Sequence, residues 1–192
     1  LYATQRPEVT RMKDRDGDGR ADVFETVADD WGINGNYHEY AVGTRHDKNG
    51  DIWVVLCLTG SGGADEKSPF RGWCMRVTEE GECIPTGYGI RSPGGIGFNH
   101  LGDVFYCDNQ GPWNGSSSLK HLCPGGFQGN PTGNKYFALT DVLGPKPPEP
   151  VSGSRIEIER KRLSNLIPPP VVLPHGKVGN SPAGIEFDET NG

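Results

Sequence analysis

Short apolar stretches alternate with polar, glycine-ended turns along the chain, and this pattern predicts antiparallel hairpins. One copy spans residues 43–54, in which the turn Asp-Lys-Asn-Gly50 leads into Asp-Ile-Trp-Val54. A second copy spans residues 97–106, and a third begins at Ala183. Glycine supplies the positive φ that a tight turn needs, and the β-branched and aromatic residues that follow favour strands. The chain is therefore predicted to be all-β.

The spacing of the copies is typical of a β-propeller. The turn glycines Gly50 and Gly102 lie about 50 residues apart, and propeller blades repeat at about 40–50 residues. The interval before the third copy is longer and holds proline-rich stretches at 144–150 and 168–170. We therefore expect a single domain over residues 1–192, a partial propeller of about three antiparallel four-stranded blades. A proline-rich insertion is expected around 144–170.

Three blades are too few to close a ring, because propellers have about 4–8 blades. An open sheet edge invites further strand pairing. We therefore expect that the rest of the propeller, or a partner chain, is needed to close the ring. The chain begins at Leu1 rather than Met and contains neither a signal peptide nor a long apolar span, which predicts that it starts inside a longer product.

Composition supports a folded protein and excludes some partners. Glycine (29 residues) and proline (16 residues) are frequent, yet four Trp, six Tyr and seven Phe are unusual for a disordered chain. The formal charge is −6 and no basic stripe is present, so nucleic acid is not expected as a partner. The one basic cluster closes the segment 155–162, whose first half alternates polar with apolar residues. That alternation predicts a solvated strand rather than a binding patch.

The five cysteines allow a disulfide but do not require one. Cys74 and Cys83 flank the expected hairpin turn at 78–81, so a bond between them is compatible with the pattern. An odd number of cysteines leaves at least one free thiol, and none of them forms a C-x-x-C motif.

The segment 14–25 fits the calcium-loop pattern D-x-D-x-D-G-x-x-D-x-x-E at every specified position. Carboxylates at alternate positions can converge on one hard cation, Gly19 permits the sharp turn, and a backbone carbonyl adds a further oxygen. The candidate metal ligands are Asp14, Asp16, Asp18, the carbonyl of Arg20, Asp22 and Glu25. The alternative is a solvated acidic turn. Because the flanks at 8–12 and 23–27 are strand-like, we expect a hairpin loop that acts as a structural clamp for calcium.

Six segments follow one another in an order that recurs in one protein family. They are residues 1–7, 38–43 with 49–54, 72–81, 89–97, 124–131 and 181–185. Together they resemble the glucose/sorbosone dehydrogenases, soluble quinoproteins that are six-bladed propellers and bind pyrroloquinoline quinone (PQQ). The likeness is stronger still to the propeller domains of bacterial membrane-bound dehydrogenase-like proteins. The resemblance implies a periplasmic, secreted or cell-surface location.

The resemblance also implies roles for two residues. His38 matches the general base that takes a proton from the sugar hydroxyl, a task that suits imidazole because its pKa lies near working pH. Arg91, in the segment Gly89-Ile-Arg91-Ser-Pro, matches the arginine that contacts the quinone and stabilises the negative charge that develops on it. Each also has a plainer interpretation, a hydrogen-bonding loop histidine and a salt-bridged arginine.

Two departures from the family pattern leave two functions open. No acid follows His38 in residues 54–60, the first being Asp65, and Ser92 stands where the family has asparagine. The first function is a calcium-containing quinoprotein that oxidises a sugar hydroxyl, with PQQ bound in the full-length protein. The alternative is a non-catalytic propeller that binds carbohydrate or protein within a surface protein. The polar-aromatic loop 109–115 follows an expected strand and is a further candidate binding segment.

Overall fold

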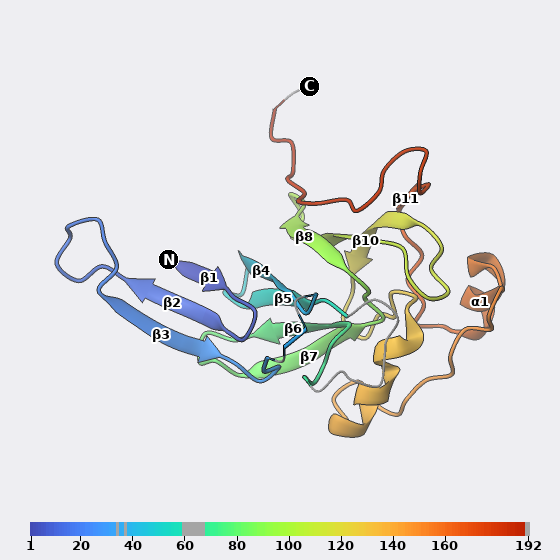
Figure 1. The fold of residues 1–192 in the computed structure, drawn as a ribbon, viewed down its shortest axis with the longest axis horizontal. Coiled ribbons are helices and arrows are strands. Elements are labelled where there is room, and N and C mark those ends of the chain that lie inside the picture. Colours follow the sequence, from blue (N-terminus) through green and yellow to red (C-terminus); the bar gives the residue numbers. More distant parts are fainter. Residues whose placement is uncertain (34, 37, 59–67, 191–192) are drawn as a thin grey trace.

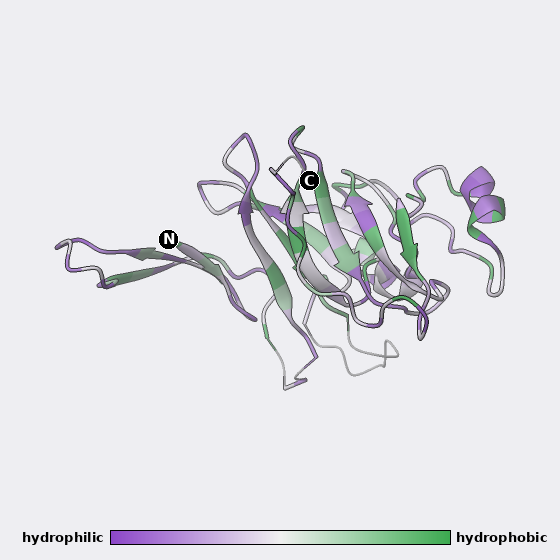
Figure 2. Ribbon diagram, turned by 90° about the horizontal axis from the view of Figure 1, so that it is seen from above, coloured by the Kyte–Doolittle hydropathy of each residue, from purple (hydrophilic) through white to green (hydrophobic). Residues whose placement is uncertain are grey.

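The computed structural model describes residues 1–33, 35–36, 38–58 and 68–190 and shows three antiparallel sheets (Figure 1). The first has the order β1-β2-β3. It comprises β1 (Tyr2–Thr4), β2 (Val9–Lys13) and β3 (Val23–Ala28). Its β2–β3 hairpin projects away from the other two sheets in both views (Figures 1 and 2). The strand-like flanks predicted for the acidic loop are thus confirmed, since β2 precedes that loop and β3 follows it.

The second sheet is a four-stranded meander in the order β4-β5-β6-β7. Its strands are β4 (Ala41–His46), β5 (Ile52–Leu56), β6 (Trp73–Val77) and β7 (Cys83–Tyr88). All five residues of β5 are buried. Ile52, Val54 and Leu56 pack into one core cluster, while Trp53 and Val55 pack into the other. A strand with both faces covered shows a continuous apolar run, which is why β5 lacks the alternation of a half-exposed strand.

The third sheet has the order β11-β10-β9-β8. Its strands are β8 (Pro93–Phe98), β9 (Val104–Asp108), β10 (Ser117–Leu122) and β11 (Val171–Leu173). Between β10 and β11 the chain makes a long excursion that contains a 3-10 helix, η1 (Pro131–Leu139), and the short helix α1 (Ile156–Arg162). The proline-rich residues 144–150 lie within this excursion.

Three of the predicted hairpin turns are confirmed, and they share one hydrogen-bond pattern. In each, the first residue of the turn both donates to and accepts from later backbone groups: Asp47 bonds Asp51 and Gly50, and Asn99 bonds Asp103 and Gly102. Thr78 does the same with Glu82 and Gly81. The turn glycines have φ between +86° and +91°, a region that L-residues other than glycine rarely adopt.

The first strands of the three sheets lie next to one another. β4 contacts β1 on one side and β8 on the other, and the Thr4 backbone N–H donates to Thr44 Oγ1 at 2.9 Å. The third repeat copy forms no strand among its described residues, but it lies against β8. A Cβ atom at Gly95 would come within 2.5 Å of the Gly184 Cα, so the small residues of β8 permit this close backbone approach.

One expectation from the sequence is wrong. The segment 155–162 is not a solvated strand, because residues 156–162 form α1. Acidic Glu157 and Glu159 occupy its first turn and basic residues its last turn, a charge order that complements the helix dipole. The disulfide that the sequence left open between Cys74 and Cys83 is not formed, since the β6–β7 register pairs Cys74 with Gly87 and Cys83 with Val77. Among the described residues, no helix is long and apolar enough to cross a membrane.

Candidate functional site

The segments that carry His38 and Arg91 meet at the end of β5. His38 lies just before β4, and Arg91 lies just before β8. The backbone N–H of Cys57 donates to the Tyr40 carbonyl at 2.8 Å, and that of Leu58 donates to the Arg91 carbonyl at 2.8 Å. The two residues after β5 therefore join the two candidate segments, which come from neighbouring sheets.

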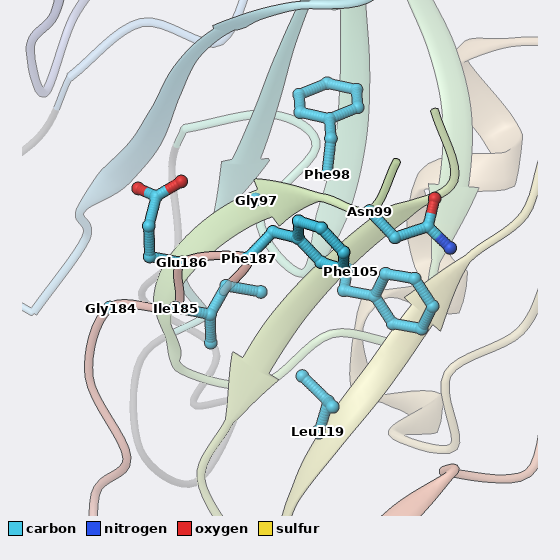
Figure 3. Close-up of a pocket in the computed structure, with 9 residues that line it drawn as sticks. All are labelled: Gly97, Phe98, Asn99, Phe105, Leu119, Gly184, Ile185, Glu186 and Phe187. Carbon is cyan, nitrogen blue, oxygen red and sulfur yellow. The ribbon is translucent and has the colours of Figure 1, made fainter. Parts of the chain in front are cut away.

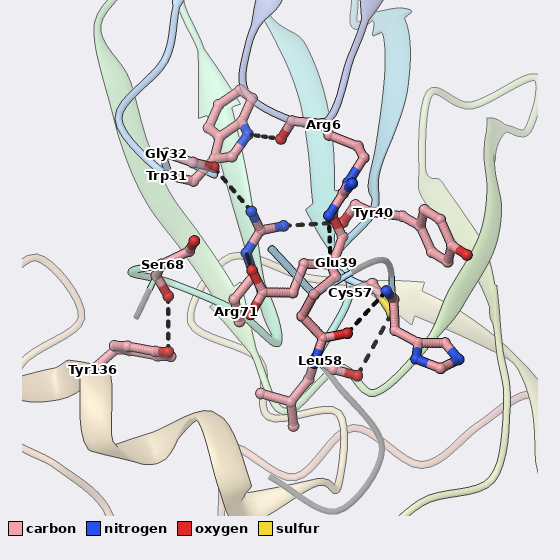
Figure 4. A network of polar contacts seen from close by, with 12 residues as sticks. Arg6, Trp31, Gly32, Glu39, Tyr40, Cys57, Leu58, Ser68, Arg71 and Tyr136 are labelled. Atoms are coloured by element: carbon pink, nitrogen blue, oxygen red, sulfur yellow. Dashed lines mark hydrogen bonds and ion pairs between the residues drawn. The ribbon is translucent and has the colours of Figure 1, made fainter. Parts of the chain in front are cut away.

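The turn that presents His38 is fastened by a buried ion pair (Figure 4). His38 is exposed, while the adjacent Glu39 is fully buried. Glu39 Oε2 lies 3.6 Å from Arg71 Nε, and both side chains are fully buried. Arg71 also donates to the carbonyls of Gly32 at 3.0 Å and Tyr40 at 3.3 Å. Burial lowers the pKa of Arg71, and the charge of Glu39 opposes that shift.

The first sheet contributes to the same network. Arg6 Nε donates to the Glu39 carbonyl at 3.2 Å, and the Arg6 carbonyl accepts a 2.9 Å bond from Trp31 Nε1. The His38 backbone N–H donates to Asn36 Oδ1 at 3.1 Å. The His38 turn is thus held from two sheets, while the imidazole itself lies at the surface.

Arg91 is held along its backbone and along its aliphatic stem. Its N–H donates to Asp108 Oδ2 at 3.2 Å, and the next N–H, of Ser92, donates to Asp108 Oδ1 at 2.7 Å. The stem packs on Gly111, where an added Cβ would lie 2.5 Å from Arg91 Cγ. Arg91 Nε is buried and makes no hydrogen bond within the described part of the chain.

The loop that covers the Arg91 stem carries further buried polar atoms without partners. In the described structure these are Gln110 Oε1, Trp113 Nε1 and Asn114 Nδ2. The loop closes on itself through a 2.8 Å bond from the Gly111 N–H to the Asn114 carbonyl, and Trp113 has a φ of +64°. Buried polar groups are usually satisfied. Several unsatisfied ones therefore lie beside one arginine, in the loop that the sequence flagged, where water or a polar ligand can supply their partners.

The acid that the family pattern places after β5 is absent from the described residues there. Cys57 and Leu58 occupy this position, and Asp65 lies outside the described residues. Cys57 Sγ is 3.6 Å from Ser92 Oγ and 3.6 Å from the Arg91 carbonyl. Desolvation raises the pKa of the Cys57 thiol. A protonated thiol therefore lies beside Arg91 and Ser92, at the position where the family has an acid.

The acidic loop brings three of its predicted ligands together. One carboxylate oxygen from each of Asp14, Asp16 and Asp18 lies within 4.8 Å of the others, and all three residues are exposed. Asp14 accepts bonds from the backbone N–H groups of Gly17 at 2.7 Å and Gly19 at 2.9 Å. These bonds, that from Gly19 first, lower the pKa of the Asp14 carboxyl. Gly19 has a φ of +86°, as its role in the sharp turn requires.

Two other predicted ligands, Asp22 and Glu25, lie outside this group. Asp22 Oδ2 accepts from the Arg15 N–H at 2.6 Å, and the Arg20 N–H donates to Asp18 Oδ1 at 2.8 Å. Glu25 lies in β3 opposite Arg11 and forms ion pairs with Arg11 at 2.7 Å and Lys13 at 3.0 Å. The β2–β3 register thus gives the Glu25 charge two cross-strand partners.

Sequence reasoning missed two features. The first is an ion pair in the third sheet between Asp108 and Lys120, whose side chains are 0% and 1% exposed. The second is a groove of about 520 Å³ between β8–β10 and the C-terminal segment, lined by apolar Phe105, Leu119 and Ile185 (Figure 3). Neither His38 nor Arg91 lines this groove. Phe105 and Leu119 are partly exposed apolar residues of β9 and β10, and Ile185 lies in the third repeat copy.

Comparison with known proteins identifies the architecture. No family model matches the chain, and no curated protein matches it. Among solved structures, the PQQ-bound aldose sugar dehydrogenase from Streptomyces coelicolor aligns with a TM-score of 0.58 and 17% identity, covering 97% of this chain and 51% of that chain. An oxidoreductase described as a glucose dehydrogenase, from Thermus thermophilus, aligns with a TM-score of 0.61 and 20% identity, covering 95% of this chain and 51% of that chain.

The holo PQQ domain of pyranose dehydrogenase from Coprinopsis cinerea gives a TM-score of 0.60 at 15% identity, covering 90% of this chain and 51% of that domain. The chain therefore spans about half the length of these structures. At these identities the likeness concerns the fold. The three sheets are blades of a partial β-propeller similar to that of the PQQ-dependent sugar dehydrogenases, which confirms the fold class and the resemblance derived from the sequence.

Proposed function

We propose that this chain forms part of a quinone-dependent propeller that oxidises a sugar hydroxyl, with Arg91 on the quinone and His38 as the general base. The observation that carries the proposal is the unpartnered, buried Nε of Arg91. The Arg91 backbone is hydrogen-bonded to Asp108, and its aliphatic stem packs against Gly111. The adjacent loop contains three more buried polar atoms without partners. The similarity of the fold to PQQ-bound sugar dehydrogenases supports this assignment.

The residues around Arg91 fit PQQ, which is a planar, anionic ortho-quinone. A guanidinium offers a fixed positive charge and directional N–H donors to such oxygens. Trp113 Nε1 and Asn114 Nδ2 are further donors in the adjacent loop, and Gln110 Oε1 is an acceptor. We therefore assign Arg91 to the quinone site, with this loop beside it.

The chemistry then divides between two segments of the chain. When bound, the quinone supplies the hydride acceptor. Arg91 places its positive charge where negative charge develops, which lowers the barrier most when the charge is preorganised. His38 takes the hydroxyl proton onto its imidazole, and its exposed position leaves it accessible to a sugar. The backbone hydrogen bonds of Cys57 and Leu58 fix the positions of the two segments relative to each other.

Calcium in this proposal is held by the projecting β2–β3 loop. Asp14, Asp16 and Asp18 supply the carboxylates, and the backbone N–H groups of Gly17 and Gly19 already fix the orientation of Asp14. Because the loop lies at the end of a hairpin that projects from the sheets (Figure 1), calcium has a structural role here and takes no part in the oxidation. Asp22 and Glu25 would have to leave their present partners in order to join it.

The remaining proposals concern assembly and location. We propose that further chain, or a partner chain, closes the ring, since this chain spans only about half of the propellers it resembles. We also propose a periplasmic, secreted or cell-surface location, in keeping with a soluble quinoprotein.

The test adds PQQ and calcium to the protein in the form in which its ring is closed. Quinone absorbance reports binding, and dye reduction with a panel of aldoses reports turnover. His38→Gln should keep the absorbance change and lose about 100-fold or more in turnover, whereas Arg91→Ala should weaken quinone binding. Arg76→Ala, which breaks a partly buried ion pair with Asp51 in the second sheet, is the matched control.

The absence of both an absorbance change and turnover would overturn the proposal. The second candidate, a non-catalytic module that binds carbohydrate or protein, would then be favoured. It is supported by the lack of an acid in the described residues after β5 and by Ser92 in contact with Cys57. Calorimetric binding of an aldose in the absence of quinone distinguishes it from the enzyme.

A further inference from the structure

We propose that Asp108 is the positioning residue for Arg91 and that Lys120 is its buried countercharge. This inference rests on the proposed function, in which Arg91 contacts the quinone. Asp108 is the last residue of β9, and Lys120 lies in the neighbouring strand β10. Neither side chain reaches solvent to more than 1% of its area. Because this charged pair is buried in the third sheet, it interacts with the residues packed directly against it and not with solvent.

Asp108 gathers four groups around one carboxylate. Its Oδ1 accepts from the Ser92 N–H at 2.7 Å, and its Oδ2 accepts from the Arg91 N–H at 3.2 Å. The Tyr106 hydroxyl donates to Oδ2 at 3.1 Å, and Lys120 Nζ lies 3.4 Å from the same oxygen. The carboxylate thus links the segment before β8 to β9 and β10.

The chemistry of this arrangement requires an acid. Two consecutive backbone N–H groups, those of Arg91 and Ser92, each need an acceptor, and the two carboxylate oxygens supply one each. An asparagine of the same shape has only one acceptor oxygen. Its amide NH2 would face one of the two N–H donors and leave it without a bond. The carboxylate therefore fixes the backbone at Arg91 in a way that its amide isostere cannot.

Lys120 is explained by the same carboxylate. Its Nζ also donates to the Gln128 carbonyl at 2.5 Å, and desolvation lowers its pKa while the charge of Asp108 opposes that shift. A buried ion pair contributes little net stability compared with well-packed apolar residues, and it can specify one geometry instead. The geometry specified here is that of the Arg91–Ser92 turn.

The consequence for Arg91 is a backbone fixed on both sides. Its N–H is bonded to Asp108, its carbonyl accepts from the Leu58 N–H at 2.8 Å, and its stem lies against Gly111. Asp108 acts through the Arg91 backbone and is not itself a catalytic residue. Losing one of its bonds would let the direction of the guanidinium vary.

The test compares Asp108→Asn, the double variant Asp108→Asn/Lys120→Met, and the control Asp51→Asn. Asp51 also forms an ion pair, with Arg76 at 3.3 Å in the second sheet. Hydrogen exchange at the amides of Arg91 and Ser92 is measured without quinone. Loss of a charge-assisted bond predicts exchange about tenfold faster or more for one of these amides in Asp108→Asn. The double variant removes both charges, so it should be more stable than Asp108→Asn, while the amide that exchanges fast in Asp108→Asn should still exchange fast. In the control, both amides should exchange at the parent's rate.

Equal protection of both amides in the parent and in Asp108→Asn would overturn the inference whether or not the protein binds quinone. Where the parent binds quinone, Asp108→Asn should also bind it about tenfold more weakly, with an unchanged KM for the aldose. If Asp108 had a purely structural role, the double variant would return stability, amide exchange and quinone binding to the parent's values. A parent that binds no quinone contradicts the proposed function, and the amide measurement still decides the role of Asp108.

Discussion

The projecting β2–β3 loop and the buried centre of the third sheet both use aspartates to accept backbone N–H bonds, but they balance the negative charge differently. Asp14, Asp16 and Asp18 are exposed and have one another as neighbours. Asp108 is fully buried, and a lysine lies 3.4 Å away. Water screens the like charges in the loop, whereas a buried charge needs a partner of its own.

The difference teaches where each region depends on an external ion. In the loop, the proposed calcium ion would complement the three clustered carboxylates. In the third sheet, Lys120 already supplies a positive charge beside Asp108. Acids arranged around backbone N–H groups can thus indicate either a metal site or a positioning device, and burial decides between them.

The largest expected effect comes from removing the buried positive charge. Lys120→Met should lower the free energy of unfolding by about 3–5 kcal/mol, because it leaves Asp108 buried without its partner. Lys13→Met is the exposed counterpart, since Lys13 pairs with Glu25 at 3.0 Å and is 42% exposed. We expect about 0.5 kcal/mol or less for it. Urea unfolding at neutral pH measures both, and equal losses would erase the contrast between the two regions.

A smaller effect is expected from the loop, and only when calcium is present. Asp16→Ala should lose the stabilisation that ligand binding gives, about 2.7 kcal/mol at a calcium concentration near one hundred times Kd. In chelator the variant and the parent should melt within about 1 °C of each other, because an exposed surface side chain contributes little. Identical melting temperatures in calcium would show that the loop does not hold the ion.

The smallest expected effect is on the melting temperature at acid pH. The folded-state pKa of Asp14 is lowered from 3.8 by bonds from the Gly19 and Gly17 N–H groups. A depressed carboxyl pKa contributes stability above the unfolded value, and that stability is lost as the pH falls through the folded-state pKa. In chelator, Asp14→Asn should therefore show a shallower fall in melting temperature below pH 3.8 than the parent. Glu80→Gln, in the 78–81 turn, should behave as the parent does.

The strands and turns were predictable because their signals are local. Gly50, Gly81 and Gly102 adopt the positive φ that their turns need, and β5 forms where the residues after the Gly50 turn favoured a strand. The segment 155–162 was misjudged because a short polar–apolar alternation can also occur in a helix. The order of acids before bases was the better signal for α1.

The candidate site was predictable only in part. The resemblance pointed to His38 and Arg91, but it did not show that Cys57 and Leu58 join their segments. The calcium pattern named six ligands, and the structure groups three of their carboxylates while pairing Glu25 with Arg11 and Lys13. The role of Asp108 had no sequence signal, because an acid and a lysine in neighbouring strands are usually solvent-exposed.

The sequence by itself determined the hairpins, the positions of the turns and the supply of charged side chains, since each depends on residues a few positions apart. The tertiary structure alone decided which charges are buried. Lys120 and Lys13 both lie in strands, yet one is enclosed within the third sheet and the other is half-exposed on the projecting hairpin. The physical reason is that burial depends on which sheet packs against which, a relation between segments far apart in the chain.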